Sequence, residues 1–313
     1  MIYKWNYEPL TPKDTEKKDE LAKQMNLHPA LCQLLIQRGI TSVNEADKFF
    51  HPSFDNLHDP FLLPDMDKAV DRIEKALGQK ERILVYGDYD VDGTTAVALV
   101  YKFLRKFTTN DEGYGISEQG IDYAFETGVT LIVALDCGIK AIEKVNYANS
   151  KGIDFIICDH HMPDETLPNA VAVVDAKRLD SIYPYEHLSG CGVGFKLAQA
   201  LAQNNKIDFS ELLDLLDLVA LSIASDIAPL TGENRVLTHY GLKQLNNSPS
   251  MGLKGIIDIC GLSHKPITVS DIVFKIGPRI NASGRMMNGK EAVDLLLANS
   301  TQDARAKSEN IDH

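Results

Sequence analysis

Three short apolar runs in this chain each end abruptly in acidic or imidazole side chains. They read Ile-Leu-Val-Tyr-Gly-Asp-Tyr-Asp-Val-Asp-Gly over residues 83–93, Leu-Ile-Val-Ala-Leu-Asp-Cys-Gly over 131–138 and Phe-Ile-Ile-Cys-Asp-His-His over 155–161. Such runs predict buried β-strands, and the carboxyl ends of parallel strands line one crevice, where ligands bind. Carboxylates gathered there would repel one another unless cations lay among them. The sequence therefore predicts a metal-dependent enzyme.

Strand and helix patterns alternate through the middle of the chain. We expect strands at 83–87, 130–135, 153–158 and 171–174, and helices at about 94–107, 117–127 and 139–151. This alternation predicts an α/β fold with a mostly parallel sheet flanked by helices and joined by right-handed crossovers. We expect three regions: an N-terminal helical region and linker (1–66), the α/β metal-binding core (67–235) and a C-terminal helical connector (236–313).

One step of this alternation is irregular. The helix that ends near Phe107 is followed almost directly by the helix at 117, although parallel pairing favours a strand between them. Our interpretation is that a segment is missing between Asn110 and Asp111.

Composition narrows the class of protein. The 313-residue chain is 44% hydrophobic and 24% charged, which is typical of a globular protein. No apolar stretch reaches the ~20 residues of a membrane helix, so no membrane partner is expected. Five scattered cysteines without a Cys-x-x-Cys pair predict a cytoplasmic location. The net charge of −12 alone argues against a nucleic-acid binder, but part of it belongs to the predicted cation site, and binding depends on a local basic patch.

The first acidic run carries Asp88, Asp90 and Asp92 at alternate positions. In extended backbone alternate side chains share a face, so we expect the three carboxylates to converge. Gly93 would then free the backbone for a turn into the next helix. A calcium loop is the alternative, but it would need a glutamate where the chain has Leu99.

The other strand ends supply further candidate ligands. Asp136 follows five apolar residues, and beside the triple Asp it is interpreted as a ligand that bridges two metals. His160 and His161 are adjacent imidazoles at a strand end, where a core role is unfavourable. Asp226 ends an apolar helix, either as a simple helix stop or as a ligand. Oxygen-rich sites with one imidazole suit manganese or magnesium better than zinc.

Two such ions ~4 Å apart can promote phosphoester hydrolysis. The turn at 277–286 adds a polar group suited to phosphate oxygens, although a capped interdomain turn is the alternative; its members are Arg279, Asn281, Ser283 and Arg285. The glycine-rich run at 190–194 predicts a tight helix entry, whose amides are also suited to phosphate. A dinucleotide site is a weaker alternative because no strand precedes these glycines.

Four motifs in fixed order carry a family resemblance. Asp-Tyr-Asp-Val-Asp-Gly, Leu-Asp-Cys-Gly, Cys-Asp-His-His and Ala-Ser-Asp-Ile-Ala-Pro resemble the motifs of the DHH phosphoesterase superfamily. Within it, Asp-Pro-Phe-Leu-Leu-Pro-Asp-Met-Asp-Lys-Ala-Val at 59–70 and Gly-Pro-Arg-Ile-Asn-Ala-Ser-Gly-Arg-Met at 277–286 resemble the RecJ family. The resemblance covers nearly the whole chain.

The resemblance implies a 5′→3′ exonuclease that uses two Mn²⁺ or Mg²⁺ ions to release 5′-mononucleotides from single-stranded DNA in repair and recombination. Its implied partners are a single-strand-binding protein and a helicase. By position, the implied metal ligands are Asp90, Asp92, Asp136, His160 and Asp226. Asp88 would be an accessory carboxylate, and His161 would contact the scissile phosphate or support the site. The implied DNA-phosphate contacts are Arg279 and Arg285.

The chain departs from the family pattern in two places. Family members carry a further strand with a Pro-x-Arg pattern before the Glu-Gly-Tyr-Gly-Ile-Ser found here at 112–117, and they continue into a second catalytic-half domain and an OB-fold. The connector is thus expected to lead to a C-terminal domain that this chain lacks. Two alternatives stay open: a DHH phosphodiesterase for short oligonucleotides or cyclic dinucleotides, and a non-catalytic DHH scaffold without metals.

Overall fold

The computed structural model describes residues 9–107, 120–286 and 289–309, except the side chains of 283–286, 301 and 308–309. The chain divides into two compact units, Met1–Asn56 and Leu57–His313. The predicted boundaries at residues 66 and 235 stay predictions. The predicted gap between Asn110 and Asp111 lies outside the described residues.

The first unit is a small helical body. Its helices are α1 (Pro12–Met25), α2 (Pro29–Ile36) and α3 (Val43–Phe50). Thr11 caps α1, and Ser42 forms a capping box with Glu45 at the start of α3, so each helix begins where a side chain can accept the first free amides. Leu21, Cys32 and Ile36 form one of its apolar clusters.

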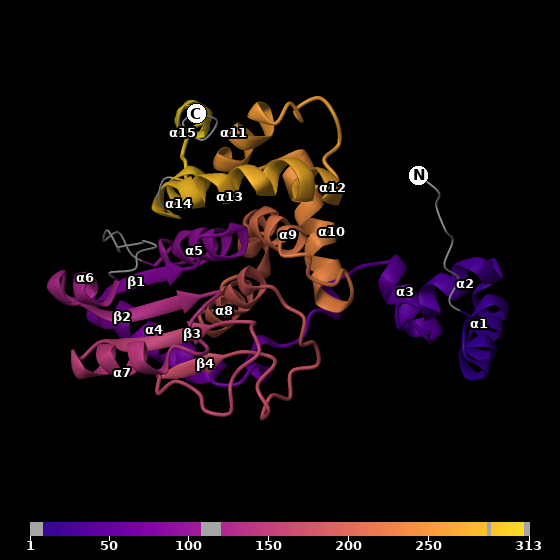
Figure 1. The fold of residues 1–313 in the computed structure, drawn as a ribbon, viewed down its shortest axis with the longest axis horizontal. Coiled ribbons are helices and arrows are strands. Elements are labelled where there is room, and N and C mark those ends of the chain that lie inside the picture. The colour runs from indigo at the N-terminus through magenta and orange to yellow at the C-terminus, as the bar shows by residue number, and fades with distance from the viewer. Residues whose placement is uncertain (1–8, 108–119, 287–288, 310–313) are drawn as a thin grey trace. The chain divides into compact units, whose positions relative to one another are not determined.

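The second unit is built on a four-stranded parallel sheet in the order β1-β2-β3-β4 (Figure 1). The strands are β1 (Arg82–Gly87), β2 (Val129–Leu135), β3 (Asp154–Cys158) and β4 (Ala172–Val174). Gly87 pairs with Leu135, Leu135 with Cys158, and Cys158 with Val174, so all four strands end in register. The predicted α/β fold with a parallel sheet is confirmed.

Helices cover both faces of the sheet. On one face, α6 (Gly120–Glu126) and α7 (Ile142–Ser150) enclose an apolar cluster with alternate strand residues such as Leu84, Ile132 and Phe155. On the other, α5 (Val91–Leu104) packs against β1 and α8 (Gly190–Asn204) against β2 and β3. A Cβ at Gly194 would lie 3.3 Å from Val100, so this glycine allows α5 and α8 to pack closely. The preceding α4 (Met66–Gln79) contacts β4 and α8.

Short 3₁₀ turns and helices make up most of the remainder. The elements are η1 (Phe54–Asn56), η2 (Pro60–Leu62), η3 (Phe209–Leu215), α9 (Leu216–Ser225), α10 (Gly232–Asn247), α11 (Met251–Ile259), α12 (Val269–Asp271), the π-helical η4 (Ile272–Ile276), α13 (Gly277–Met286), α14 (Gly289–Leu296) and α15 (Thr301–Glu309). Within the described ranges, no helix is long and apolar enough to cross a membrane.

The run at 277–286 was expected to form a turn, and this expectation is wrong. It forms α13, which continues directly from η4. Pro278 cannot donate a hydrogen bond to a carbonyl of the preceding turn, and the π-helical turn lies at that point. A proline in the first turn is therefore compatible with the helix.

Candidate metal centre

An aspartate directly follows each of the four strands. These residues are Asp88, Asp136, Asp159 and Asp175. Because the strands end in register, their carboxyl groups leave the sheet along one edge. The sequence reasoning assigned site roles to Asp88 and Asp136. It showed Asp159 only within a motif and missed Asp175, although the same signal, an aspartate after a short apolar strand, marks it.

Asp136 is the most constrained of these residues. Its φ of +59° places it in the left-handed region, which Asp and Asn tolerate better than other non-glycine residues. Its side chain is 3% exposed, and Oδ1 lies 3.0 Å from His160 Nε2. No described residue donates a hydrogen bond to this buried oxygen. A Cβ at Gly190 would lie 2.6 Å from the carboxyl carbon, so this glycine makes room for the group.

The electrostatics of Asp136 point to a cation. Burial, with the nearby charges of Asp92 and Asp90, raises the pKa of Asp136 to about 10. A buried carboxylate without donors is costly when ionised, and a bound cation removes that cost. The orphaned oxygen and the neighbouring His160 nitrogen therefore fit a metal ion.

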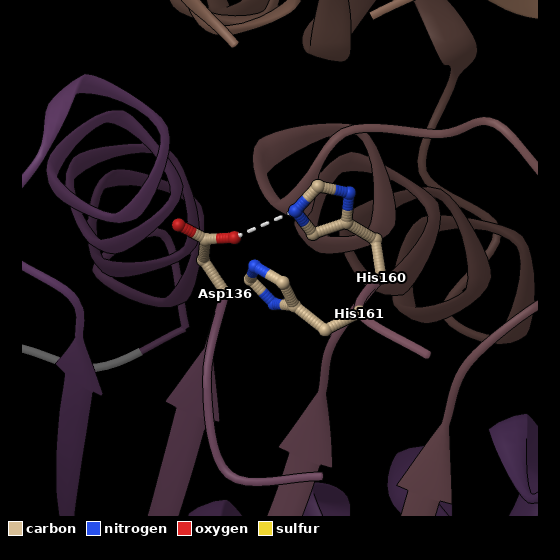
Figure 2. A group of neighbouring side chains, drawn as sticks. All are labelled: Asp136, His160 and His161. Carbon is tan, nitrogen blue, oxygen red and sulfur yellow. Dashed lines mark ion pairs between the residues drawn. The ribbon is translucent and has the colours of Figure 1, made fainter. Parts of the chain in front are cut away.

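Asp159 orients the two histidines. It is 1% exposed, and its Oδ1 accepts the backbone N–H groups of His160 (2.8 Å) and His161 (3.2 Å). The same oxygen faces His161 Nδ1 at 2.7 Å, while Oδ2 accepts the Ile139 N–H at 3.0 Å. Burial alone would raise the pKa of Asp159, but these contacts hold it below its usual value, and the Asp159 contact raises the pKa of His161. Figure 2 shows His160 directed at Asp136, with His161 beside it. The sequence showed Asp159 within the motif but did not assign it this role.

The three alternating aspartates do not share one face of an extended segment, so that expectation is wrong. The helix α5 begins at Val91, and Asp90 is its N-cap, whose carboxylate accepts the Gly93 N–H at 3.0 Å. Asp88 stays at the strand end, where its Oδ1 accepts the Tyr89 N–H at 2.7 Å. Gly93 is needed for a close approach, because a Cβ there would lie 2.6 Å from the backbone nitrogen of Asp88.

Asp92 is buried in the first turn of α5 and faces α8. Its carboxylate accepts the N–H groups of Gly190 and Cys191, each at 2.7 Å, and the Ser222 hydroxyl at 2.7 Å. The amides that were expected to suit phosphate therefore bind a carboxylate of the chain itself. The start of a helix favours such a charge, since its first N–H groups have no partner within the helix.

Two overlapping groups of side chains meet the geometry of a metal site. Ligand atoms of Asp136, His160 and His161 lie within 4.8 Å of one another, and so do those of Asp92, His160 and Asp226. Asp226 is the C-cap of α9, and desolvation together with the charge of Asp92 raises its pKa. Asp88 and Asp90 belong to neither group. Asp90 nevertheless contributes to the raised pKa of Asp136, so its charge lies nearby.

Of the predicted phosphate-binding residues, the structure brings Asn281 to the site. Its Oδ1 accepts the Val91 N–H at 3.0 Å. Arg279 Nη1 lies 3.1 Å from Cys260 Sγ. The side chains of Ser283 and Arg285 lie outside the described part of the chain. A phosphate role for these four residues stays a prediction.

Two further buried polar residues at this edge were missed by the sequence reasoning. Ser222 links Asp92 to Ser189, because the Ser222 and Ser189 hydroxyl oxygens lie 2.6 Å apart. Asp175 is fully buried, its Oδ1 accepts the Lys177 N–H at 2.7 Å, and burial raises its pKa to about 7. The Lys177 ammonium also donates to the His160 carbonyl. No local pattern marks Ser222, because its partner Asp92 lies 130 residues away.

Comparisons of the sequence with family profiles and with curated proteins point to the same kind of protein. The profile described as "DHH family, N-terminal domain" matches residues 82–223. The chain is 36% identical over 309 residues to the single-stranded-DNA-specific exonuclease RecJ of Bacillus subtilis, covering 96% of this chain and 38% of that protein. It is 33% identical over 306 residues to the Escherichia coli protein of the same name, covering 91% and 52%. The chain thus spans about half or less of these relatives.

Solved structures that are similar to this chain include RecJ proteins as well. RecJ of Thermus thermophilus in complex with Mn²⁺ superimposes with a TM-score of 0.81 at 28% identity, over 97% of this chain and 44% of that one. An exonuclease RecJ bound to manganese gives a TM-score of 0.71 at 30% identity, over 80% and 65%.

Proposed function

We propose that the chain is the catalytic core of a metal-dependent 5′→3′ exonuclease that hydrolyses single-stranded DNA to 5′-mononucleotides, because residues 82–223 match the DHH family profile and the chain is 36% identical to a RecJ exonuclease. The observation that carries the proposal is the buried Asp136 carboxylate. It has an orphaned oxygen, a strongly raised pKa and His160 in contact with it. The relatives named for this activity support the choice of substrate.

The proposed ions are two Mn²⁺ or Mg²⁺. Carboxylates with a single shared imidazole suit these hard cations, and His160 belongs to both candidate groups. The proposed ligands are Asp90, Asp92, Asp136, His160 and Asp226. When bound, such a pair lowers the pKa of water and stabilises charge on the attacking and leaving oxygens.

The residues around the ligands have separate roles. Asp159 accepts the backbone N–H of His160, which fixes the backbone from which the His160 ring reaches Asp136. His161 keeps Nδ1 on Asp159, so its Nε2 is left for substrate. Because Asp159 raises the pKa of His161, the ring carries a proton more readily and can donate to an oxygen of the scissile phosphate. Asp88 serves as an accessory carboxylate at the edge of the site.

DNA contacts complete the proposal. Arg279 and Arg285 would bind backbone phosphates, with Asn281 and Ser283 as smaller hydrogen-bonding partners. A helicase would supply the unpaired strand and a single-strand-binding protein would present it, in DNA repair and recombination. The scattered spacing of the five cysteines, without a Cys-x-x-Cys pair, supports a reducing cytoplasm as the location.

The test is nuclease activity on 5′-labelled single strands with Mn²⁺. We expect native protein to release labelled mononucleotide. Asp136→Ala should release it more slowly by a factor on the order of 100, because a metal ligand is lost. The exposed control Asp67→Ala should release it at the native rate. Equal rates for native protein and Asp136→Ala would refute the proposal. Faster cleavage of a dinucleotide than of a long strand would instead support the small-substrate alternative.

A further inference from the structure

The helix α13 contacts the start of α5 through one side chain. Asn281 Oδ1 accepts the Val91 N–H at 3.0 Å, across 190 positions of sequence. Val91 is the first residue of α5, lies between Asp90 and Asp92, and is 1% exposed. The Asp90 carboxylate already accepts the Gly93 N–H, so the Val91 amide is a separate donor at the helix start. Asn281 therefore satisfies a buried amide in the middle of the acidic motif.

The same face of α13 also contacts the end of α9. Gly277 lies four residues before Asn281, so the two share one side of the helix. A Cβ at Gly277 would lie 2.8 Å from Ser225 Oγ, and Ser225 directly precedes Asp226. One helix face thus touches both the element that carries Asp92 and the element that carries Asp226.

We propose that α13 holds Asp92 and Asp226 at the spacing that a divalent cation requires, with Asn281 as the positioning residue. This inference rests on the proposed two-metal function. Asp92, His160 and Asp226 form one candidate group, and two of its three members come from helices that α13 contacts. An amide oxygen does not bind phosphate, so this contact gives Asn281 Oδ1 a role separate from DNA binding.

Loss of the Asn281 oxygen leaves the Val91 amide buried without a partner, so the turn that carries Asp92 must move. Residues that orient metal ligands in this way typically contribute a factor of ~10 to 100 in metal affinity. A side chain that keeps an oxygen at this position preserves the contact. The proposal therefore distinguishes Asn281→Ala from Asn281→Asp.

Calorimetric titration with MnCl₂ tests this directly. We expect Asn281→Ala to bind Mn²⁺ ~10-fold more weakly than native protein, and Asn281→Asp to bind at least as tightly as native. The matched control is Asn246→Ala. Asn246 Oδ1 accepts the Ile267 N–H at 2.7 Å, so the control removes the same kind of contact in another part of the fold. Its Mn²⁺ affinity should equal that of native protein.

Gly277→Ala changes the same helix face where it meets α9, and it should also weaken Mn²⁺ binding. This second variant keeps the test decisive if circular dichroism shows that Asn281→Ala is unfolded. Native affinity in both Asn281→Ala and Gly277→Ala would overturn the inference. An equal loss in Asn246→Ala, or a loss in Asn281→Asp as large as in Asn281→Ala, would do the same. If native protein itself binds no Mn²⁺, the proposed function fails together with the inference, and this outcome is read from the native titration alone.

Discussion

Replacing Asp136 with asparagine in metal-free protein should stabilise the fold at neutral pH. Burial and the charges of Asp92 and Asp90 raise the pKa of the Asp136 carboxyl from 3.8 to about 10 in the folded protein. Between these values the unfolded chain has lost the proton and the folded chain keeps it. Stability is therefore highest below the unfolded pKa and falls as the pH rises through this window.

The size of the effect follows from the same shift. About 3 pH units separate 3.8 from neutrality, and each is worth about 1.4 kcal/mol, so the unfavourable contribution reaches roughly 4 kcal/mol at pH 7 and about 2 kcal/mol at pH 5. At 3% exposure, the side chain is little screened by solvent. Asparagine has the same shape, does not titrate and tolerates the φ of +59°, so the substitution should introduce little backbone strain.

Urea unfolding in a chelating buffer at pH 5, 7 and 8 measures this difference. We expect Asp136→Asn to exceed native protein in free energy of unfolding, by an amount that grows with pH. Mn²⁺ at 100 times its Kd should then raise native stability by about 2.7 kcal/mol and narrow the gap. The exposed control Asp164→Asn should stay within about 0.5 kcal/mol of native at every pH. A native protein more stable than Asp136→Asn in chelator at pH 8 would refute the reasoning.

Three further substitutions test other parts of the unit. Gly190→Ala should abolish Mn²⁺ binding in calorimetry, because its new methyl group would lie 2.6 Å from the Asp136 carboxyl carbon; native affinity would contradict this. Glu233→Gln should lower the free energy of unfolding, measured in urea, by ~3–5 kcal/mol. The fully buried Lys196 ammonium lies 2.5 Å from Glu233 and would lose its counter-charge. A loss under ~1 kcal/mol would contradict this prediction. Asp159→Asn should lower the pKa of His161 in an NMR titration, because the Asp159 carboxylate raises this pKa in the native protein. An unchanged His161 pKa would exclude Asp159 as the cause.

The strands and their acidic ends could be predicted because both signals are local. A short apolar run that stops at Asp or His shows where a strand ends, and parallel pairing then brings separate strand ends to one edge. Asp136 and His160 follow from this reasoning, and the structure places them 3.0 Å apart. Asp175 obeys the same rule and could have been found from the run at 171–174.

The errors arose where a helix cap or a tertiary contact overrides the simplest local pattern. Alternating Asp90 and Asp92 suggested extended backbone, but α5 begins between them because Asp90 caps it. The glycine and proline at 277–278 suggested an interruption, yet Gly277 serves a close approach to Ser225 within a continuous helix. Gly93, which donates to the Asp90 cap, lies only three residues away, so this cap could have been found from the sequence, whereas Ser225 is distant from Gly277 and no local pattern could reveal that contact.

Two buried carboxylates of the site, Asp92 and Asp136, have opposite hydrogen-bonding environments. Asp92 receives two helix amides and the Ser222 hydroxyl, so the protein itself stabilises its charge. Asp136 Oδ1 receives no hydrogen bond from the described residues and lies against His160. The fold therefore supplies hydrogen bonds to the Asp92 carboxylate, whereas a charge on Asp136 needs a cation to stabilise it. It follows that protons and divalent cations should compete at Asp136, and also at Asp226, whose pKa is raised too, so that metal affinity rises with pH.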